Sequence, residues 1–258
     1  MRGALVPRYV RLLGIAATGF LPAGGLFLGA GRGGGAAWMA GAVCLVVLAL
    51  AVGWPGLSGV PAPGSAALVL ALTGAIAVAL AGWWTGTDSP VLVAVGLGLP
   101  AIFVRELARP APRADLVRSV AAMAGGVMAL AVCGLWVTAS RADQFQDLAI
   151  VAGCGIAAAC LALGLSSLIR ADWSFEAGAA GGVVLAAGAG GAVSFGVGTP
   201  WWAGVCVAAA CGLAPGALWL VSSRRSVFSG RARWRDAALV ALPLAVAAVP
   251  VWAAQLMR

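Results

Sequence analysis

Long apolar runs alternate with short polar connections along almost the whole chain. Most of the runs approach the roughly 20 residues that a helix needs to cross the hydrocarbon core of a bilayer. The nine runs are Leu12–Ala30, Ala37–Gly53, Ala66–Trp84, Pro90–Val104, Ser119–Ala139, Ala149–Ile169, Ala177–Val197, Trp202–Val221 and Ala237–Leu256. We predict that each is a transmembrane helix, because a helix satisfies its own backbone polar groups in lipid.

The composition also indicates a membrane protein. The 258 residues are 62% hydrophobic and 9% charged, whereas a soluble domain is typically about a quarter charged. A soluble chain of this length would still need a polar surface. The sequence therefore predicts an all-α polytopic bundle in which residues 1–258 form one integral membrane domain. We expect the first run to stay uncleaved, because it is longer than the apolar core of a signal peptide.

The distribution of arginine predicts the orientation of the chain in the membrane. All sixteen basic residues are arginine. If successive connections alternate between the two sides, thirteen fall on the side of the N-terminus and only Arg32, Arg141 and Arg258 on the other. Cytoplasmic connections accumulate arginine and lysine, so we predict the N-terminus inside and the C-terminus outside. Abundant Ala, Gly and Val with no Lys is typical of a high-GC bacterial genome, which predicts a bacterial inner (plasma) membrane.

Two connections carry most of the positive charge. Residues 103–118 hold a quarter of all charged side chains, and residues 222–236 hold five arginines. We interpret both first as topology signals. They are also candidate contacts for anionic lipids at the cytoplasmic face or for a protein partner. The candidate residues are Arg105, Arg109, Arg113, Arg224, Arg225, Arg231, Arg233 and Arg235.

The basic connections suggest an internal organisation of the bundle. They begin 119 residues apart, each after four runs, which gives a 4+4+1 arrangement of residues 1–118, 119–236 and 237–258. Four spans per unit would make the two halves parallel, as in some transporters. Sorting of positive charge to the inside produces the same spacing, and we favour that explanation.

Glycine and proline mark one candidate site within the spans. The fourth run contains Gly96, Gly98 and Pro100 in close succession. Proline removes a backbone hydrogen bond from a helix, and a broken helix at bilayer depth can line a binding site.

In the seventh run, the spacing of Gly178 and Gly182 favours close approach of helices. We interpret the many glycines of the seventh run mainly as packing residues rather than as a mobile or pore-lining element.

Tryptophans gather near the predicted span ends. This distribution is typical of the aromatic belts at the two membrane interfaces. We place Trp38, Trp83, Trp84, Trp136, Trp201, Trp202 and Trp252 near the outer ends, and Trp54, Trp219 and Trp234 near the inner ends.

The residue types leave little room for catalysis. The chain has no His and no Lys, which excludes Ser–His and Ser–Lys nucleophile pairs, and it has no Walker A motif. The acidic residues are scattered near span ends, so we predict no catalytic residues, no metal site and no cofactor. Because the chain has no soluble domain that could present a helix or strand to a nucleic-acid groove, we also predict no nucleic-acid binding.

The cysteines lie in apolar runs and are interpreted as small buried residues. They are Cys44, Cys133, Cys154, Cys160, Cys206 and Cys211.

Three classes of function stay open. We favour a permease or transporter-like protein for a small or lipidic solute. The first alternative is a non-catalytic subunit or scaffold of a bacterial membrane complex, in contact with a membrane-protein partner or with further copies of itself. The second is a lipid-processing enzyme that clamps phosphate with arginine. A solvated cavity at Gly96–Pro100 would favour transport, and a dry bundle would favour the scaffold.

Overall fold

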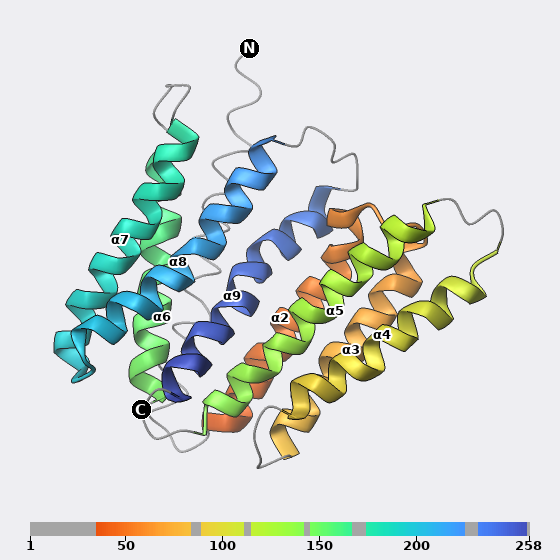
Figure 1. Ribbon diagram of the computed structural model, residues 1–258, viewed down its shortest axis with the longest axis horizontal. Coiled ribbons are helices and arrows are strands. Elements are labelled where there is room, and N and C mark those ends of the chain that lie inside the picture. The colour runs from red at the N-terminus through yellow and green to blue at the C-terminus, as the bar shows by residue number, and fades with distance from the viewer. Residues whose placement is uncertain are drawn as a thin grey trace. The chain divides into compact units, whose positions relative to one another are not determined.

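In the computed structural model, the residues described are 35–83, 89–110, 115–141, 145–166, 174–224 and 232–256. Within these ranges the chain forms eight helices and no strand (Figure 1). The helices are α2 (Gly35–Ser58), α3 (Pro63–Trp83), α4 (Ser89–Ala108), α5 (Leu116–Ala139), α6 (Phe145–Ser166), α7 (Ser174–Val197), α8 (Trp201–Arg224) and α9 (Ala232–Leu256). The all-α prediction is confirmed for this part of the chain.

Each helix overlaps one of the apolar runs and begins before it. Helix α4 reaches Ala108 instead of stopping at Val104, and α2 passes through Pro55 to end at Ser58. The connection predicted over residues 54–65 is therefore only a short turn. The first run, Leu12–Ala30, lies outside the described residues. The count of nine spans and the orientation of the termini stay predictions.

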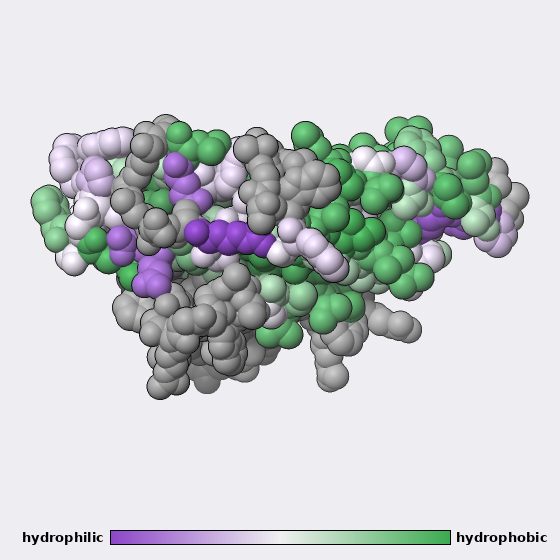
Figure 2. Space-filling model, turned by 90° about the horizontal axis from the view of Figure 1, so that it is seen from below, coloured by the Kyte–Doolittle hydropathy of each residue, from purple (hydrophilic) through white to green (hydrophobic). Residues whose placement is uncertain are grey.

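The helices have the length and surface of membrane spans. Six helices among the described residues, α2 to α7, are long and apolar enough to cross a bilayer. The described apolar parts of α8 and α9 are shorter. Large apolar side chains such as Leu68, Leu92 and Val184 are more than 60% exposed, and Figure 2 shows a broad apolar surface on one face. Such a surface needs lipid or other apolar groups around it, as expected for a multi-pass membrane protein.

The contacts divide the chain into two compact units. Among described residues, the α2–α5 unit comprises 39–138 with the first part of α9 (232–248). The α6–α8 unit comprises 35–38, 139–224 and the last residues of α9 (249–256). The predicted 4+4+1 organisation stays a prediction.

Helices α2 to α5 pack around large apolar side chains in the α2–α5 unit. Leu70, Met123, Val127 and Leu130 are fully buried there. The indole of Trp54 on α2 donates a hydrogen bond to the Ala122 carbonyl of α5, with Nε1 and O 2.8 Å apart. Trp54 thus joins two helices through an internal hydrogen bond in addition to any role at the membrane interface.

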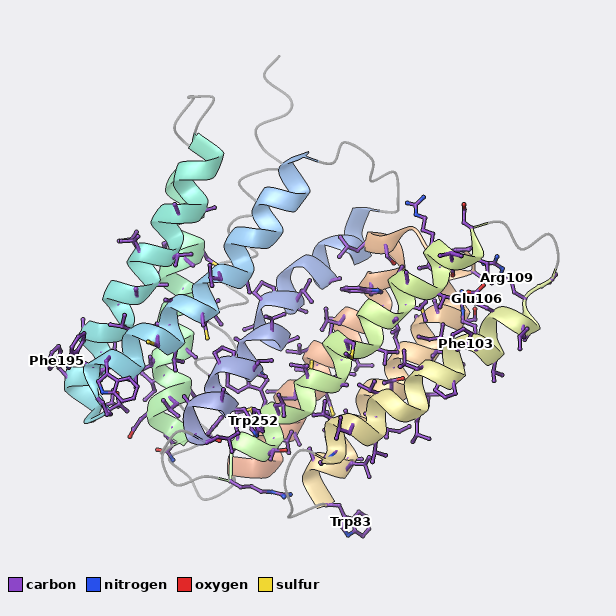
Figure 3. The ribbon with its side chains drawn as sticks, in the orientation of Figure 1. Trp83, Phe103, Glu106, Arg109, Phe195 and Trp252 are labelled. Carbon is purple, nitrogen blue, oxygen red and sulfur yellow. The ribbon has the colours of Figure 1, made fainter. Side chains whose placement is uncertain are left out.

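Trp136 was predicted to lie in the outer aromatic belt; it does lie near the end of α5, but its side chain is turned into the protein. Its side chain is only 7% exposed, and its Nε1 lies 2.8 Å from the Leu244 carbonyl oxygen of α9, to which it donates. A buried indole N–H needs an acceptor, and this carbonyl provides one. Trp83, by contrast, is 90% exposed at the end of α3 (Figure 3), as an interfacial tryptophan should be.

The α6–α8 unit packs through small residues. A methyl group added at Gly182 of α7 would lie 3.3 Å from the Ala159 oxygen of α6. One added at Gly190 of α7 would lie 2.4 Å from the Gly204 oxygen of α8. The backbone of α7 therefore packs directly against the backbones of α6 and α8, which small residues make possible in membrane helices. This agrees with the packing interpretation of the seventh run at these two positions.

Candidate functional site

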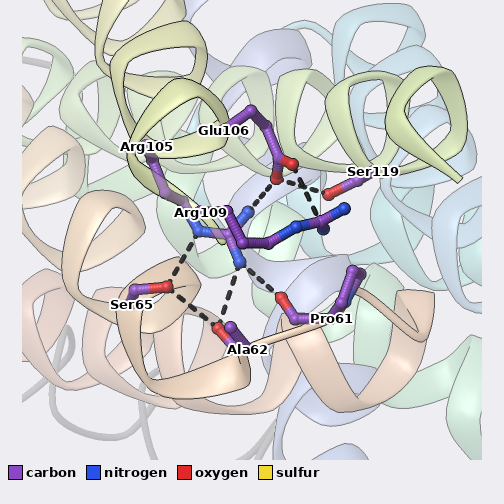
Figure 4. Close-up of polar contacts among 7 residues, drawn as sticks. All are labelled: Pro61, Ala62, Ser65, Arg105, Glu106, Arg109 and Ser119. Atoms are coloured by element: carbon purple, nitrogen blue, oxygen red, sulfur yellow. Dashed lines mark hydrogen bonds and ion pairs between the residues drawn. The ribbon is translucent and has the colours of Figure 1, made fainter. Parts of the chain in front are cut away.

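A cluster of charged and polar groups lies at one end of the α2–α5 unit, which we call the charged end. There the α2–α3 turn, the last turn of α4 and the first turn of α5 meet (Figure 4). The arginine count predicts connections 54–65 and 105–118 on the same side of the membrane, and in the structure Arg105 of the second contacts Pro61 and Ala62 of the first. Which side of the membrane this is stays a prediction.

Local sequence explains the shape of the α2–α3 turn. Gly59 has a φ of +69° and its N–H bonds the Pro55 carbonyl at 3.0 Å, which is a left-handed cap at a helix C-terminus. Pro63 begins α3, where its missing N–H costs nothing. Ala62 has a φ of +53°, a strained value for a residue with a side chain. The turn thus presents the carbonyls of Pro61 and Ala62 toward α4.

Arg105 of α4 uses its guanidinium to hold this turn. Its Nε donates to Ser65 Oγ at 3.0 Å, and its Nη2 donates to the Ala62 oxygen at 3.1 Å and to the Pro61 oxygen. Nη1 is paired with Glu106 Oε1. The side chain is 6% exposed. One arginine therefore ties the end of α4 to the strained turn and to the first residues of α3.

Glu106 lies at the centre of the charged end and is 2% exposed. Besides Arg105, it accepts a hydrogen bond from Ser119 Oγ of α5 at 2.7 Å and forms an ion pair with Arg109, whose Nη1 lies 3.1 Å from Oε2. A carboxylate is disfavoured near the C-terminus of its own helix and favoured near the N-terminus of another. Its position beside the first turn of α5, together with the two arginines, compensates for the first effect.

The charges of this cluster do not balance. Two guanidinium groups share one carboxylate, and all three side chains are at most 12% exposed. The geometry of the Arg109–Glu106 pair is that of an ion pair without a well-directed hydrogen bond. Removing charge from water is costly unless it is paired. The backbone carbonyls of Pro61 and Ala62 supply part of the compensation for Arg105.

The broken-helix segment is continuous in the structure. Helix α4 runs through Pro100 without interruption. Gly96 and Pro100 are exposed on the outside of the helix, and no described atom lies within 4 Å of a methyl group added at Gly96. Gly98 is buried, and a methyl group there would lie 2.8 Å from Val127 Cγ1 and 3.0 Å from Thr73 Oγ1. A binding role for this segment stays a prediction.

The arginines named from the sequence fall into two sets. Arg105 and Arg109 are drawn into the charged end, which does not suit an exposed lipid or partner contact for Arg105. Arg113, Arg225 and Arg231 lie outside the described residues, and Arg224, Arg233 and Arg235 belong to α8 and α9 with side chains outside the described set. Their contacts stay predictions.

Sequence reasoning missed Glu106, Ser65 and Ser119 as site residues. The sequence predicts Glu106 only as a charge near a span end, Ser65 as the last residue of a connection and Ser119 as the first residue of a run. The signal that could have found the acid is its position between Arg105 and Arg109 at the end of an apolar run, where an unpaired carboxylate would be costly. Nothing in the pattern identifies the serines, because each is brought in by a different helix.

No family model, curated protein or solved structure matches this chain. In the described part of the chain, no three His, Cys, Asp or Glu side chains gather as a metal site would require. The six cysteines, all within the described residues, form no disulfide, and Cys133, Cys160 and Cys211 are buried in helices. The apolar helices indicate an integral membrane helical protein, and its described residues include a buried ionic cluster.

Proposed function

We propose that this chain is a non-catalytic subunit that gives structural support within a membrane complex. The observation that carries the proposal is the packing at Gly98. This residue is the buried member of Gly96, Gly98 and Pro100, the segment predicted as a possible solute site. Its Cα lies so close to Thr73 and Val127 that even a methyl group would clash. A dense interior at this place suits a structural role better than a solute path.

The charged end supports the same role. In an enzyme that clamps phosphate, or in a path for an anionic solute, arginines would face the ligand. Arg105 instead donates hydrogen bonds to Ser65 and to the α2–α3 turn and forms an ion pair with Glu106. These contacts fix the ends of three helices relative to one another. The arrangement rigidifies the unit, which is what a subunit that positions other spans requires.

The outer surface of the α2–α5 unit offers room for a partner span. Leu68 and Leu72 lie one helical turn apart on α3 and are 61% and 54% exposed. Such a ridge of side chains can pack into the groove of another helix. Another copy of this chain or a different membrane protein could supply that helix.

Native mass spectrometry of the chain, purified in mild detergent from cells that express it at its natural level, tests the proposal. We expect one assembly of defined mass that contains this chain and at least one further polypeptide. Replacing both Leu68 and Leu72 by alanine should weaken that assembly, whereas the same change at Leu185 of α7, which is 51% exposed, tests whether the loss is specific. A monomer under every mild condition would contradict the proposal.

Gly98→Ala should destabilise the protein by about 1–3 kcal/mol, because overpacking a close helix contact forces neighbouring atoms to move. Gly96→Ala is the matched control, two residues away on the same helix with open space around it. It should be neutral or slightly stabilising, since alanine is the better helix former. Thermal unfolding in detergent measures both. If Gly98→Ala is as stable as the control, the segment has free volume and the transport interpretation gains support.

A permease for a small or lipidic solute is the second candidate, and the buried charge at the end of α4 favours it. Ionisable groups inside membrane spans often mark solute or ion paths. Purified protein in proteoliposomes separates the two candidates when challenged with a panel of small solutes and labelled lipids. Flux above that of empty liposomes, altered by Glu106→Gln in protein that stays folded, would support the permease and contradict a purely structural subunit.

A further inference from the structure

Pro100 leaves one backbone carbonyl of α4 without its usual hydrogen bond. A helix carbonyl accepts from the N–H four residues later, and proline has no N–H to donate. Because α4 continues through Pro100, the carbonyl that loses its partner is that of Gly96. Gly96 lies roughly 10 Å along the helix axis from the start of α4 at Ser89. The carbonyl is therefore well inside the candidate span Pro90–Ala108.

The described part of the protein offers no donor to this carbonyl. Thr73 of α3 lies against Gly98, but its hydroxyl donates to the Val69 carbonyl of its own helix at 2.9 Å. Gly96 itself is exposed, and no described atom lies within 4 Å of a methyl group added to it. A backbone carbonyl without a donor is costly in hydrocarbon, where no water can replace the lost bond. The missing donor therefore belongs to a group that approaches α4 from outside.

The surface around Gly96 suits a neighbouring helix. Figure 1 shows α4 at the edge of the α2–α5 unit, and large apolar side chains are exposed along it. These side chains are Leu92, Leu97, Phe103, Val104 and Leu107. Gly96 and Pro100 are also exposed and lie between them, one helical turn apart. A glycine at such a place lets a second backbone approach closely in a membrane.

The missing donor identifies the kind of neighbour. Lipid acyl chains have no donor, so lipid alone leaves the carbonyl unsatisfied. A second copy of this chain is also a poor match, because the hydroxyls described within its apolar runs are already engaged. The hydroxyls in question are those of Thr73, Ser119, Thr138 and Ser194. These observations favour a helix of another polypeptide that carries a hydroxyl or an amide.

We propose that the exposed face of α4 around Gly96 binds a transmembrane helix of a different membrane protein. A serine, threonine, asparagine or glutamine of that helix donates a hydrogen bond to the Gly96 carbonyl, and its apolar side chains pack against Leu92 and Leu97. The inference rests on the proposed function as a subunit and deepens it, because it assigns the partner a face and a chemistry. It adds a contact on α4 to the ridge of Leu68 and Leu72 on α3.

Photocrosslinking in membranes of cells that express the full chain at its natural level tests this face. A photoreactive phenylalanine analogue replaces Leu97, the exposed residue next to Gly96. We expect a crosslink to one peptide of another membrane protein, and that peptide should hold a serine, threonine, asparagine or glutamine within an apolar run. The same analogue at Leu185, which is exposed on α7, is the control and should not yield that peptide.

Three variants that carry the analogue at Leu97 separate the hydrogen bond from general packing. Pro100→Ala supplies the missing N–H within α4, so the donor of the partner is no longer needed. The crosslinked fraction, followed through dilution into mild detergent, should then show about threefold weaker association, the usual contribution of one hydrogen bond between membrane helices. Gly96→Leu fills the open position and should remove the crosslink. Gly188→Leu is its matched control on α7, equally open, and should leave the crosslink unchanged.

Native mass spectrometry of the parent protein separates failure of this inference from failure of the proposed function. Crosslinks to lipid alone, in a chain that still forms an assembly with another polypeptide, would overturn the α4 site and leave the subunit proposal standing. The same crosslinks in a monomeric chain would overturn both. A crosslinked peptide from this chain itself would show that a second copy or another of its own segments covers α4. Unaltered association of Pro100→Ala would show that the carbonyl is not recognised, and either of these two results would overturn the inference.

Discussion

Glu106→Gln is expected to destabilise the protein by about 3–5 kcal/mol, the usual cost of removing one partner from a buried ion pair. The glutamine has nearly the same shape and can still accept from Ser119, but it removes the carboxylate charge that Arg105 and Arg109 share. Both guanidinium groups are at most 12% exposed, so water cannot take over that role. The unfolding temperature in detergent should fall by on the order of 10 °C.

The buried thiol of Cys133 on α5 provides a local readout of this loss. A maleimide that fluoresces on reaction should label Cys133 at a lower temperature in Glu106→Gln, and peptide mass spectrometry can separate it from the other cysteines. Asp115→Asn is the matched control. Asp115 is an exposed acid at the same end with a φ of +58°, a conformation that asparagine also accepts. Equal effects of the two changes would mean that the buried pairing contributes little.

A double variant separates charge from packing at the charged end. Replacing Glu106 and Arg109 together by glutamine removes one charge of each sign, so the deficit should be smaller than for Glu106→Gln alone. Neighbouring charges are expected to be non-additive in this way. An additive result would show that Glu106 acts through its shape and its bond with Ser119 and not through its charge.

The helices could be predicted because lipid imposes a simple rule on sequence. A span must be apolar over its whole length, so the run Ser119–Ala139 predicts α5, Leu116–Ala139, to within three residues. The ends are harder, because capping groups decide them. Helix α2 continues past Gly53 and through Pro55, and the turn at Gly59 provides its cap.

The charged end could be predicted only in part. The concentration of charge in residues 103–118 is visible in the sequence, and so is its placement beside a span end. What no pattern shows is that Arg105 reaches the carbonyl of Pro61, 44 positions earlier. That contact depends on α3 and α4 lying antiparallel with a particular register. Arg105 therefore looked like a topology signal and is also a cross-link between helices.

The exposure of the tryptophans also could not be predicted from the sequence. Trp83 and Trp136 both lie near predicted span ends, and the belt rule treats them alike. Only Trp83 is exposed. Trp136 instead faces α9, where a backbone carbonyl accepts its N–H. Position along a span predicts the depth of a residue in the membrane, but which face of the helix meets a neighbour is decided by tertiary packing.

Gly190→Ala should strongly destabilise the α6–α8 unit. The added methyl group would lie 2.3 Å from the Ala208 Cβ and 2.4 Å from the Gly204 oxygen. Both belong to α8, and the second is backbone, so neither can turn aside as a long side chain could. The helices would have to separate along their contact, and we expect a loss of about 3 kcal/mol, at the upper end of the range for overpacking.

Gly188→Ala is the control for this substitution. It lies on the same helix, two residues earlier, and no described atom lies within 4 Å of the position its methyl group would take. Because alanine favours the helix over glycine by about 1 kcal/mol, this variant should be as stable as the parent or more so. Labelling of the buried thiols Cys160 on α6 and Cys211 on α8 should shift to lower temperature only in Gly190→Ala. Should both variants unfold together with the parent protein, α7 and α8 would not be in the close contact on which the packing of this unit depends.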